Sequence, residues 1–259
     1  MQDVHPLVSI IMPSYNCGKY LEETICSVQA QTYNNWEIIF MDDCSTDDTV
    51  NIIAELRRKD LRIKYFQNQC NSGAAVSRNN ALREAKGKWI AFLDSDDLWE
   101  PKKLEKQIKF MEENGYSFSY TAYQEIDSEG TLTGVAVSGP KHVTKASMYA
   151  FCWPGCLTVM YDRETVGLIQ IEDIKKNNDY AMWLKVCKKA DCYLLDECLA
   201  KYRRGRVGSI SSHSIKTMIG WHYKLWHEAE KRGVLASLWL TGVNLVCGLY
   251  KKKRYVKRR

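Results

Sequence analysis

The first part of the chain alternates between short apolar runs and segments whose apolar residues recur at helical spacing. Short continuous apolar runs are typical of buried strands, and apolar residues at i, i+3 and i+4 are typical of helices packed on a sheet. Strands and helices that alternate over short connections predict a mainly parallel sheet covered by helices on both faces. The strand-like runs are 7–12 (LVSIIM), 36–41 (WEIIFM), 62–68 (RIKYFQN) and 89–93 (WIAFL).

Helix boundaries and the second half of the chain give weaker signals. Gly87 follows a predicted helix and is a candidate for its C-terminal cap, and Pro101 is placed to start the next helix. Farther along, the sequence predicts two strands around a turn at 127–130, a strand at 156–162 and a helix that begins at Asp179. Two aromatic-rich helical segments follow from residue 215.

Polar residues gather where three of the predicted strands end. In a parallel α/β sheet, ligands bind beyond the carboxyl ends of the strands. Neither a GxGxxG dinucleotide signature nor a P-loop is present. The residues in question are Pro13, Ser14, Tyr15 and Asn16 after the first strand, Asp42 and Asp43 after the second, and Asp94, Asp96 and Asp97 after the fourth.

The acidic cluster at the end of the fourth strand is a candidate metal site. In an extended stretch, Asp94 and Asp96 point the same way, and two carboxylates make the hard oxygen site that Mg²⁺ or Mn²⁺ prefers. A bound cation also removes the repulsion between the two charges. The alternative is a solvated loop that caps the helix at Pro101, the role expected of Asp97.

Charge and cysteine content narrow the function further. The chain has 259 residues and a net charge of +6, but the last nine residues, KKKRYVKRR, hold seven of the basic side chains. The rest of the chain has 30 basic and 31 acidic residues, which argues against a broad nucleic-acid-binding face. Ten cysteines without a CxxC pair, and no secretory signal, favour reduced thiols in a cytosolic protein without a zinc site.

Several motifs in order resemble the family 2 glycosyltransferases. The motifs are VSIIMPSYNCGKYLEETICSVQAQTY, WEIIFMDDCSTDDT, NSGAAVSRNNALREAKGKWIAFLDSDDLW and NDYAMWLKV, spread over residues 7 to about 212. The resemblance implies a GT-A fold, an α/β architecture with a Rossmann-like, mainly parallel central sheet and a C-terminal helical tail. It implies an inverting enzyme that needs Mn²⁺ or Mg²⁺ and uses a nucleotide-diphospho-sugar. Bacterial members that build O-antigen, capsule and exopolysaccharide are the most similar.

The resemblance also implies roles for individual residues. Pro13, Tyr15 and Asn16 match the segment near the uracil, and Asp43 with Asp42 matches the acidic pair, one member of which hydrogen-bonds the base. Arg78 matches the diphosphate side. Asp94, Ser95 and Asp96 match the DxD motif, with Asp96 on the metal and Asp94 near the metal, ribose and sugar. Asp179 matches the general base, which takes a proton from the acceptor hydroxyl.

The implied substrates follow from the same motifs. The donor is expected to be a UDP-hexose or UDP-N-acetylhexosamine. The acceptor is expected to be a saccharide, linked to a lipid such as undecaprenyl diphosphate at the cytoplasmic face of the membrane. Nucleic acid is not an expected partner.

Three positions depart from the family pattern. Asn178 stands where the family usually has Glu, Cys44 where it often has Gly, and Arg206 where it has His. Residues 202–211 are expected to form a mobile loop that orders over the donor.

The sequence divides into a glycosyltransferase domain, residues 1–212, and a C-terminal region, residues 213–259. Within the domain, residues 7–115 are expected to bind the nucleotide sugar and residues 116–212 the acceptor. Residues 234–250 carry no charge, yet polar and glycine positions weaken them as a membrane span. With the basic tail, they predict a helix that lies on an anionic membrane surface. The alternative is a helix packed on the body with a solvated basic end.

Two rival functions remain open at this point. A nucleotidyltransferase can share the sheet and the metal carboxylates, but it is expected to have a glycine-rich, basic N-terminal loop, and MPSYNCGKYLEE has neither property. A non-catalytic nucleotide-sugar-binding protein would not need both Asp96 and Asp179.

Overall fold

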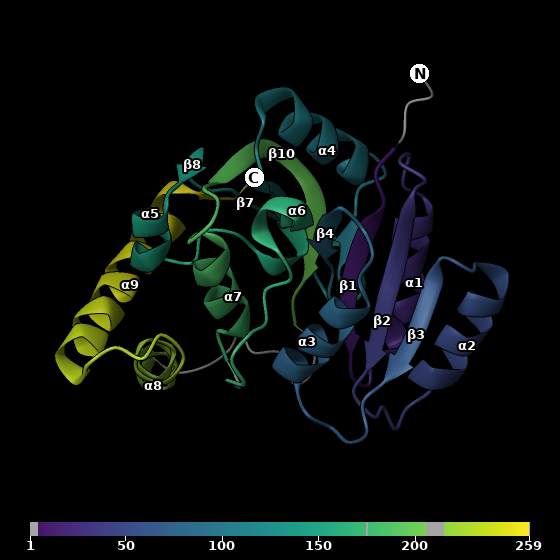
Figure 1. Ribbon diagram of the computed structural model, residues 1–259, viewed down its shortest axis with the longest axis horizontal. Helices are drawn as coiled ribbons and strands as arrows, with labels where there is room; N and C mark the ends of the chain where they lie inside the picture. The colour runs from purple at the N-terminus through teal and green to yellow at the C-terminus, as the bar shows by residue number, and fades with distance from the viewer. Residues whose placement is uncertain (1–4, 175, 206–214, 259) are drawn as a thin grey trace.

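Four parallel strands form the N-terminal half of the central sheet in the computed structural model, which describes residues 5–174, 176–205 and 215–258 (Figure 1). They run in the order β4-β1-β2-β3, as the alternating pattern predicts. Every residue of β1, β2 and β4 is buried, which explains their nearly continuous apolar sequences. Their bounds are β1 Val8–Ser14, β2 Trp36–Asp42, β3 Ile63–Gln67 and β4 Trp89–Phe92.

Helices cover both faces of these strands. On one face, α1 (Gly18–Gln29) and α2 (Thr49–Lys59) bury Leu21, Ile25 and Ile53 against strand residues such as Ile10. On the other face, α3 (Ala74–Glu84) packs on β1 and β2 and buries Ala81 and Leu82. Side chains alternate across a strand, so neighbouring strand residues feed two separate apolar cores. This arrangement leaves the carboxyl ends of the strands uncovered.

The second half turns the sheet from parallel to mixed. Strand β9 (Met160–Asp162) lies antiparallel to both β4 and β6, and β10 (Cys192–Arg203) runs parallel to β6 but antiparallel to β5 and β8. The predicted hairpin around residues 127–130 is confirmed as β6–β7. The other elements are β5 Leu98–Trp99, α4 Lys103–Asn114, β6 Phe118–Ile126, β7 Leu132–Val137, β8 His142–Val143, α5 Lys145–Ala150, η1 Cys156–Thr158, α6 Arg163–Val166 and α7 Asn178–Val186.

The C-terminal segment folds back onto the sheet. Helices α8 (Ile215–Lys224) and α9 (Val234–Arg254) flank a π-helical turn, η3 (Leu225–Ala229), and lie at the end of the molecule opposite α2 (Figure 1). After α9, the strand β11 (Val256–Arg258) pairs antiparallel with β7 and extends the sheet. The domain boundary predicted at residue 212 lies outside the described residues.

Two boundary predictions are wrong for identifiable reasons. The helix before Gly87 already ends with Ala85 as its C-cap, and Gly87 is needed for a close backbone approach instead. A Cβ there would lie 2.6 Å from the carbonyl oxygen of Leu7 and from the amide nitrogen of Ser9. The helix expected at Pro101 begins at Lys103, because residues 101 and 102 form a turn.

Candidate active site

Arg78 connects the two parts of the predicted active site. It lies on α3, is buried, and donates from Nη2 to Asp94 Oδ1 at 2.6 Å. Its Nη1 donates to Asn178 Oδ1, also at 2.6 Å, and Asn178 begins α7. Burial is the largest single influence on Arg78 and lowers its pKa, but the charges around it, with Asp94 first, together raise that pKa above its usual value. One guanidinium therefore joins the acidic cluster after β4 to the helix that carries Asp179.

The cluster itself is a tight turn and not the extended stretch expected from the sequence. The backbone N–H of Asp97 donates to the carbonyl of Asp94 at 3.1 Å, which closes a β-turn over residues 94–97. The side chains of Asp94 and Asp96 are partly exposed, whereas Ser95 and Asp97 are buried. The argument that Asp94 and Asp96 share a side because the chain is extended is therefore wrong, although both carboxylates stay accessible at the strand end.

Asp97 has a structural role different from the predicted one. It does not cap the next helix: its Oδ1 accepts the backbone N–H of Arg203 at 2.8 Å, so it ties the turn to the end of β10. Burial, followed by the charges of Asp96 and Asp94, raises the pKa of Asp97 well above its usual value. The buried Asp97 carboxyl stabilises the turn from the protein interior, while the carboxylates of Asp94 and Asp96 stay partly exposed.

Arg203 fixes the same turn and was not singled out from the sequence. It is buried, donates from Nε to the carbonyl of Asp96 at 2.8 Å, and forms an ion pair with Glu23 through Nη2 at 2.6 Å. Its Nη1 contacts the carbonyls of Asp127 and Ser128 in the β6–β7 turn. The only signal in the sequence is its place within residues 202–211, the segment expected to form a mobile loop.

Asp179 lies in the first turn of α7 and does not form its N-cap. The N-cap is Asn177, in the left-handed region with a φ of 59°, and Asp179 Oδ1 accepts the N–H of Tyr180 at 2.8 Å. The Asp179 carboxylate is close enough to raise the pKa of Arg78, together with the stronger effect of Asp94. The structure thus brings Asp179 and Asp94, distant in sequence, within electrostatic range of one guanidinium.

The acidic pair after β2 organises the neighbouring loops. Asp42 is fully buried and accepts hydrogen bonds from the Ser45 N–H and from Gln67 Nε2. Asp43 Oδ2 accepts the N–H of Gly73 at 2.7 Å. The other oxygen, Oδ1, accepts from Asn68 Nδ2 and from the Ser72 N–H at 2.7 and 2.8 Å. A carboxylate offers about four acceptor positions, so these three contacts leave one position of Asp43 unused, on a side chain that is only 4% exposed.

The residues after β1 are held in a fixed loop at the same edge of the sheet. Pro13 is within β1, and Tyr15 follows the strand with its side chain about half exposed (46%), which leaves the ring able to meet a ligand. Asn16 has a φ of 47°, and its Oδ1 accepts the N–H of Thr46 at 2.8 Å. Cys44 has a φ of 61°, a conformation that glycine adopts without strain.

The donor set fits a divalent cation that is shared with a substrate. The two partly exposed carboxylates, Asp94 and Asp96, offer hard oxygen ligands of the kind Mg²⁺ and Mn²⁺ prefer. Among the described residues, no group of three His, Cys, Asp or Glu side chains could hold a metal without help. Mg²⁺ is usually bound through one or two carboxylates plus substrate phosphates, so this small donor set suits a metal that arrives with a diphosphate.

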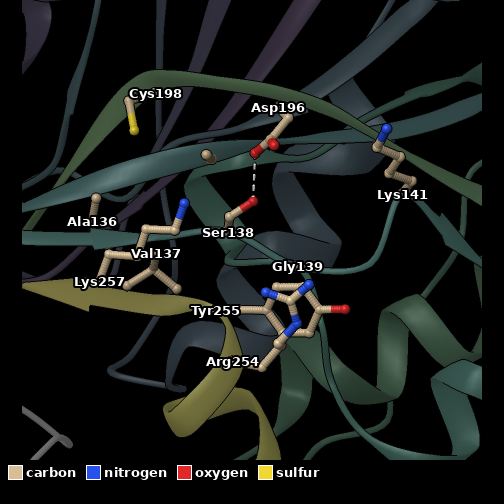
Figure 2. Close-up of a pocket in the computed structure, with 11 residues that line it drawn as sticks. Ala136, Val137, Ser138, Gly139, Lys141, Asp196, Cys198, Arg254, Tyr255 and Lys257 are labelled. Atoms are coloured by element: carbon tan, nitrogen blue, oxygen red, sulfur yellow. Dashed lines mark hydrogen bonds between the residues drawn. The ribbon is translucent and has the colours of Figure 1, made fainter.

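Two other features of the structure lie outside the predicted active site. A cavity of about 480 Å³ opens between β7, β10 and β11, and none of the predicted site residues lines it (Figure 2). All ten cysteines lie in the described part of the chain, and none of them forms a disulfide. Burial raises the pKa of the Cys152 and Cys156 thiols well above the usual value, so both stay protonated and neither is an activated nucleophile.

Part of the predicted loop over the donor can be located. Tyr202 and Arg203 belong to β10, so the expectation of a mobile loop is wrong for these two residues. Arg206 and the rest of that segment, through residue 211, lie outside the described residues.

Comparison with known proteins assigns these residues to a family. The model of glycosyl transferase family 2 matches residues 9–151. The putative teichuronic acid biosynthesis glycosyltransferase TuaG of Bacillus subtilis is 41% identical over the full length of both chains. An Escherichia coli relative is 42% identical over 82% of this chain and 83% of its own; it is WfaP, the UDP-Glc:alpha-D-GlcNAc-diphosphoundecaprenol beta-1,3-glucosyltransferase.

A solved structure has the same fold. The crystal structure of S. aureus TarS residues 1–349 in complex with UDP-GlcNAc superimposes with a TM-score of 0.69. The match covers 92% of this chain and 71% of the TarS chain at 22% sequence identity. At that identity the likeness concerns the fold, which is the GT-A arrangement expected from the sequence.

Proposed function

The chain belongs to glycosyl transferase family 2, and from this premise we propose that it transfers a hexose or N-acetylhexosamine from a UDP-sugar to a hydroxyl of a lipid-linked saccharide. The reaction would serve the synthesis of a bacterial surface polysaccharide. The observation that carries the proposal is the Arg78 bridge, which joins Asp94 on the donor side to Asn178, the neighbour of Asp179. Such a bridge suits a site where donor and acceptor must meet.

The donor would lie along the carboxyl ends of β1, β2 and β4. Tyr15 offers a half-exposed ring to the uracil, and Asp43 retains an acceptor position for the base. Asn16 and Asp42 would hold the surrounding loop, and Pro13 would shape the end of β1. Ser95, whose carbonyl accepts from Thr24, would keep the turn between Asp94 and Asp96 in place.

Asp96, with Asp94, would hold a Mn²⁺ or Mg²⁺ ion. When bound, the ion neutralises negative charge on the diphosphate leaving group. Arg78 would add a fixed positive charge on the same side, and its contact with Asp94 would keep that carboxylate in position. Two residues later than Asp94, Asp96 projects from the same turn, so the pair forms one compact ligand set.

Asp179 would act as the general base. Its place in the first turn of α7 lets its free oxygen accept a proton from the acceptor hydroxyl as the oxygen attacks the anomeric carbon. A single displacement from the face opposite the leaving group inverts the anomeric centre. Because the thiols near the site are protonated, no covalent intermediate on cysteine competes with this route.

The acceptor and location follow from the relatives. WfaP, as its name states, acts on a saccharide linked to diphosphoundecaprenol, and a similar lipid-linked acceptor would place this protein at the cytoplasmic face of the membrane. A nucleotidyltransferase is not favoured, because the loop after β1 lacks the glycine-rich, basic character that a triphosphate requires.

The donor assignment can be tested with a thermal-shift panel of nucleotide sugars, with and without Mn²⁺. We expect UDP-sugars to raise the Tm only when the cation is present, and the sugar that does so most should then be transferred to a GlcNAc-diphospholipid. Stabilisation by nucleoside triphosphates, with release of pyrophosphate, would overturn the proposal in favour of a nucleotidyltransferase.

A further inference from the structure

The inner face of helix α9 carries three polar residues beside Leu240, and most of its large apolar residues are on the outer face. Asn244 is fully buried, where Oδ1 accepts from Trp226 Nε1 and Nδ2 donates to the carbonyls of Tyr149 and Ala150. Thr241 and Ser237, also buried, lie on the same side about one and two turns earlier. Surface helices normally show the reverse pattern, with apolar residues facing the core.

The opposite side of α9 is an exposed apolar stripe. Its six large side chains are each between 53% and 84% exposed, and their spacing places them on one face of the helix. Contiguous exposed apolar patches usually mark an interaction site, because a soluble monomer gains nothing by keeping them in water. The stripe consists of Leu235, Leu238, Trp239, Val246, Leu249 and Tyr250.

The chain around the stripe is strongly basic. Residues 231–259 contain nine Lys or Arg and no Asp or Glu. Lys231 and Arg232 precede the helix, and Lys252 and Lys253 are exposed in its last turn. An apolar stripe bounded at both ends by positive charge matches a membrane surface, where acyl chains lie beneath anionic headgroups.

Further cations lie at the carboxyl end of α9. Arg254, Lys257 and Lys141 line the cavity between β7, β10 and β11, whose one acidic residue, Asp196, is engaged by the hydroxyl of Ser138 at 2.6 Å (Figure 2). The cavity is therefore cationic and large enough, at about 480 Å³, to admit a phosphate headgroup.

The contacts of α9 favour a helix that lies on the membrane over one that crosses it. By length and composition, Val234–Arg254 could span a bilayer. However, Asn244 holds the middle of the helix to α5 and η3, and β11 ties its carboxyl end to β7. A span would have to break these contacts and leave the Asn244 amide in hydrocarbon without partners.

The same helix reaches the acceptor side of the active site. Lys251 is on the buried face of α9, and its Nζ donates to the carbonyls of Trp153 at 2.7 Å and Cys152 at 3.5 Å. Burial lowers the pKa of Lys251, and the charge of Asp179 opposes that effect.

We infer that the outward face of α9 is a docking surface for an anionic lipid membrane, with the helix lying in the interface plane. The stripe enters the region beneath the headgroups, and the cations at both ends contact phosphates. The docking itself does not rest on the proposed function, because binding to a membrane requires no nucleotide sugar.

The test is co-sedimentation of the full chain with vesicles. One set contains phosphatidylcholine and phosphatidylglycerol, and the other contains phosphatidylcholine alone. The stripe variant carries Leu235→Gln, Trp239→Gln, Val246→Gln and Leu249→Gln, and the matched control carries Leu61→Gln and Leu132→Gln, two exposed leucines outside α9. A charge variant carries Lys252→Glu and Lys253→Glu.

We expect the wild type and the control to bind anionic vesicles. The stripe variant should bind at least about tenfold more weakly, and the charge variant should lose the preference for anionic lipid. Circular dichroism and retained transfer from the UDP-sugar to a water-soluble acceptor would show that both variants are folded. If the wild type does not catalyse that transfer, the result contradicts the proposed function and leaves the vesicle-binding result intact.

Two results would overturn the inference. One is a wild type that stays in the supernatant with anionic vesicles. The other is a dimer, measured by light scattering, that the stripe variant converts to a monomer while vesicle binding is unaffected, because the stripe would then meet a second copy of this chain.

Discussion

The strand ends of the N-terminal half and helix α9 arrange polar and apolar residues in opposite ways. At the strand ends, apolar side chains fill two cores and the polar ones meet at an open edge, where Asp94 and Asp96 remain partly exposed. In α9, the polar side chains of Thr241 and Asn244 are buried, and most of the large apolar side chains, although not Leu240, are in water. The first arrangement suits a water-soluble nucleotide sugar, and the second suits an apolar surface.

The difference shows that the burial or exposure of a side chain indicates its role only when its contacts are known as well. Asn244 is buried with every contact satisfied, which is what makes an inverted helix stable on the protein. Asp94 is partly exposed, and Arg78 contacts its Oδ1. The first contact is a structural anchor, and the second leaves a carboxylate available to a ligand.

The largest expected effect is at the open edge. Asp96→Ala removes one of two carboxylates proposed to hold the cation, so transfer should fall by about 10³-fold or more and Mn²⁺ should no longer strengthen UDP-sugar binding. Calorimetric titration with UDP-sugar and Mn²⁺ measures the binding. Asp191→Ala, an acidic residue that pairs with His142, serves as the control and should behave as the wild type. Unchanged Mn²⁺-dependent binding in the Asp96 variant contradicts the metal assignment.

The Arg78 bridge is expected to matter somewhat less. Arg78→Lys keeps a positive charge but cannot contact Asp94 and Asn178 together, because it lacks the planar fork. We expect kcat/KM to fall by about 10²-fold, since small misplacements of reacting groups have effects of this size. Steady-state kinetics would measure it, with Arg83→Lys, an exposed residue of the same helix, as control. Equal losses in both variants would refute a specific role for the bridge.

One substitution on the buried face of α9 and one on its exposed face test the second half of the comparison. Asn244→Leu leaves the Trp226 indole N–H and two backbone carbonyls without their partner, so the free energy of unfolding should fall by about 2–3 kcal/mol. Leu238→Gln, on the outward face, should change it by less than about 0.5 kcal/mol. Urea unfolding of the soluble protein gives both values. A larger loss for the Leu238 variant would mean that the stripe packs on the protein.

The smallest effect compares two buried lysines. Lys103 on α4 is fully buried, no hydrogen bond to its Nζ is found in the described part of the chain, and burial lowers its pKa well below the usual value. At pH 7 the unfolded chain therefore binds the proton more tightly than the folded one, and stability rises as the pH approaches the unfolded pKa of about 10.4.

Lys103→Met should accordingly raise the Tm at pH 7 by about 2–4 °C, and the gain should shrink toward pH 10. Lys251→Met should lower the Tm instead, because Lys251 loses two carbonyl contacts. Scanning calorimetry from pH 7 to pH 10 checks both. A gain that grows with pH would contradict the sign of the Lys103 pKa shift.

The sequence predicts the N-terminal half of the fold well, because the signals for its strands come from residues adjacent in the chain. Strands β1, β2 and β4 are continuous apolar runs, and their ends carry the polar residues that the fold brings together. The Arg203 contacts could not be predicted in this way, since they join β10 to residues about 100 positions earlier. The same is true of β10, whose bulged pairing with β6 interrupts the alternation by which strands are recognised.

The inverted helix shows a different limit. The uncharged stretch at 234–250 reveals an apolar segment, but only tertiary contacts determine which side is buried. In the structure Asn244 faces the protein. From the sequence alone, it counts only as a polar residue that weakens the segment as a membrane span. The conformation of Cys44 is a further example, because its left-handed φ is set by hydrogen bonds around it and not by its own preference.

The central claim is that Asp179 is the base of an inverting sugar transfer, and single-turnover transfer by Asp179→Asn tests it most directly. The reaction is run with a ¹³C-labelled UDP-sugar, and NMR reads the configuration of the anomeric carbon in the product. We predict an inverted product from the wild type. The variant should transfer about 10²–10⁴-fold more slowly, with UDP-sugar affinity unchanged. A variant that transfers at the wild-type rate, or a wild type that retains the configuration, would contradict the account.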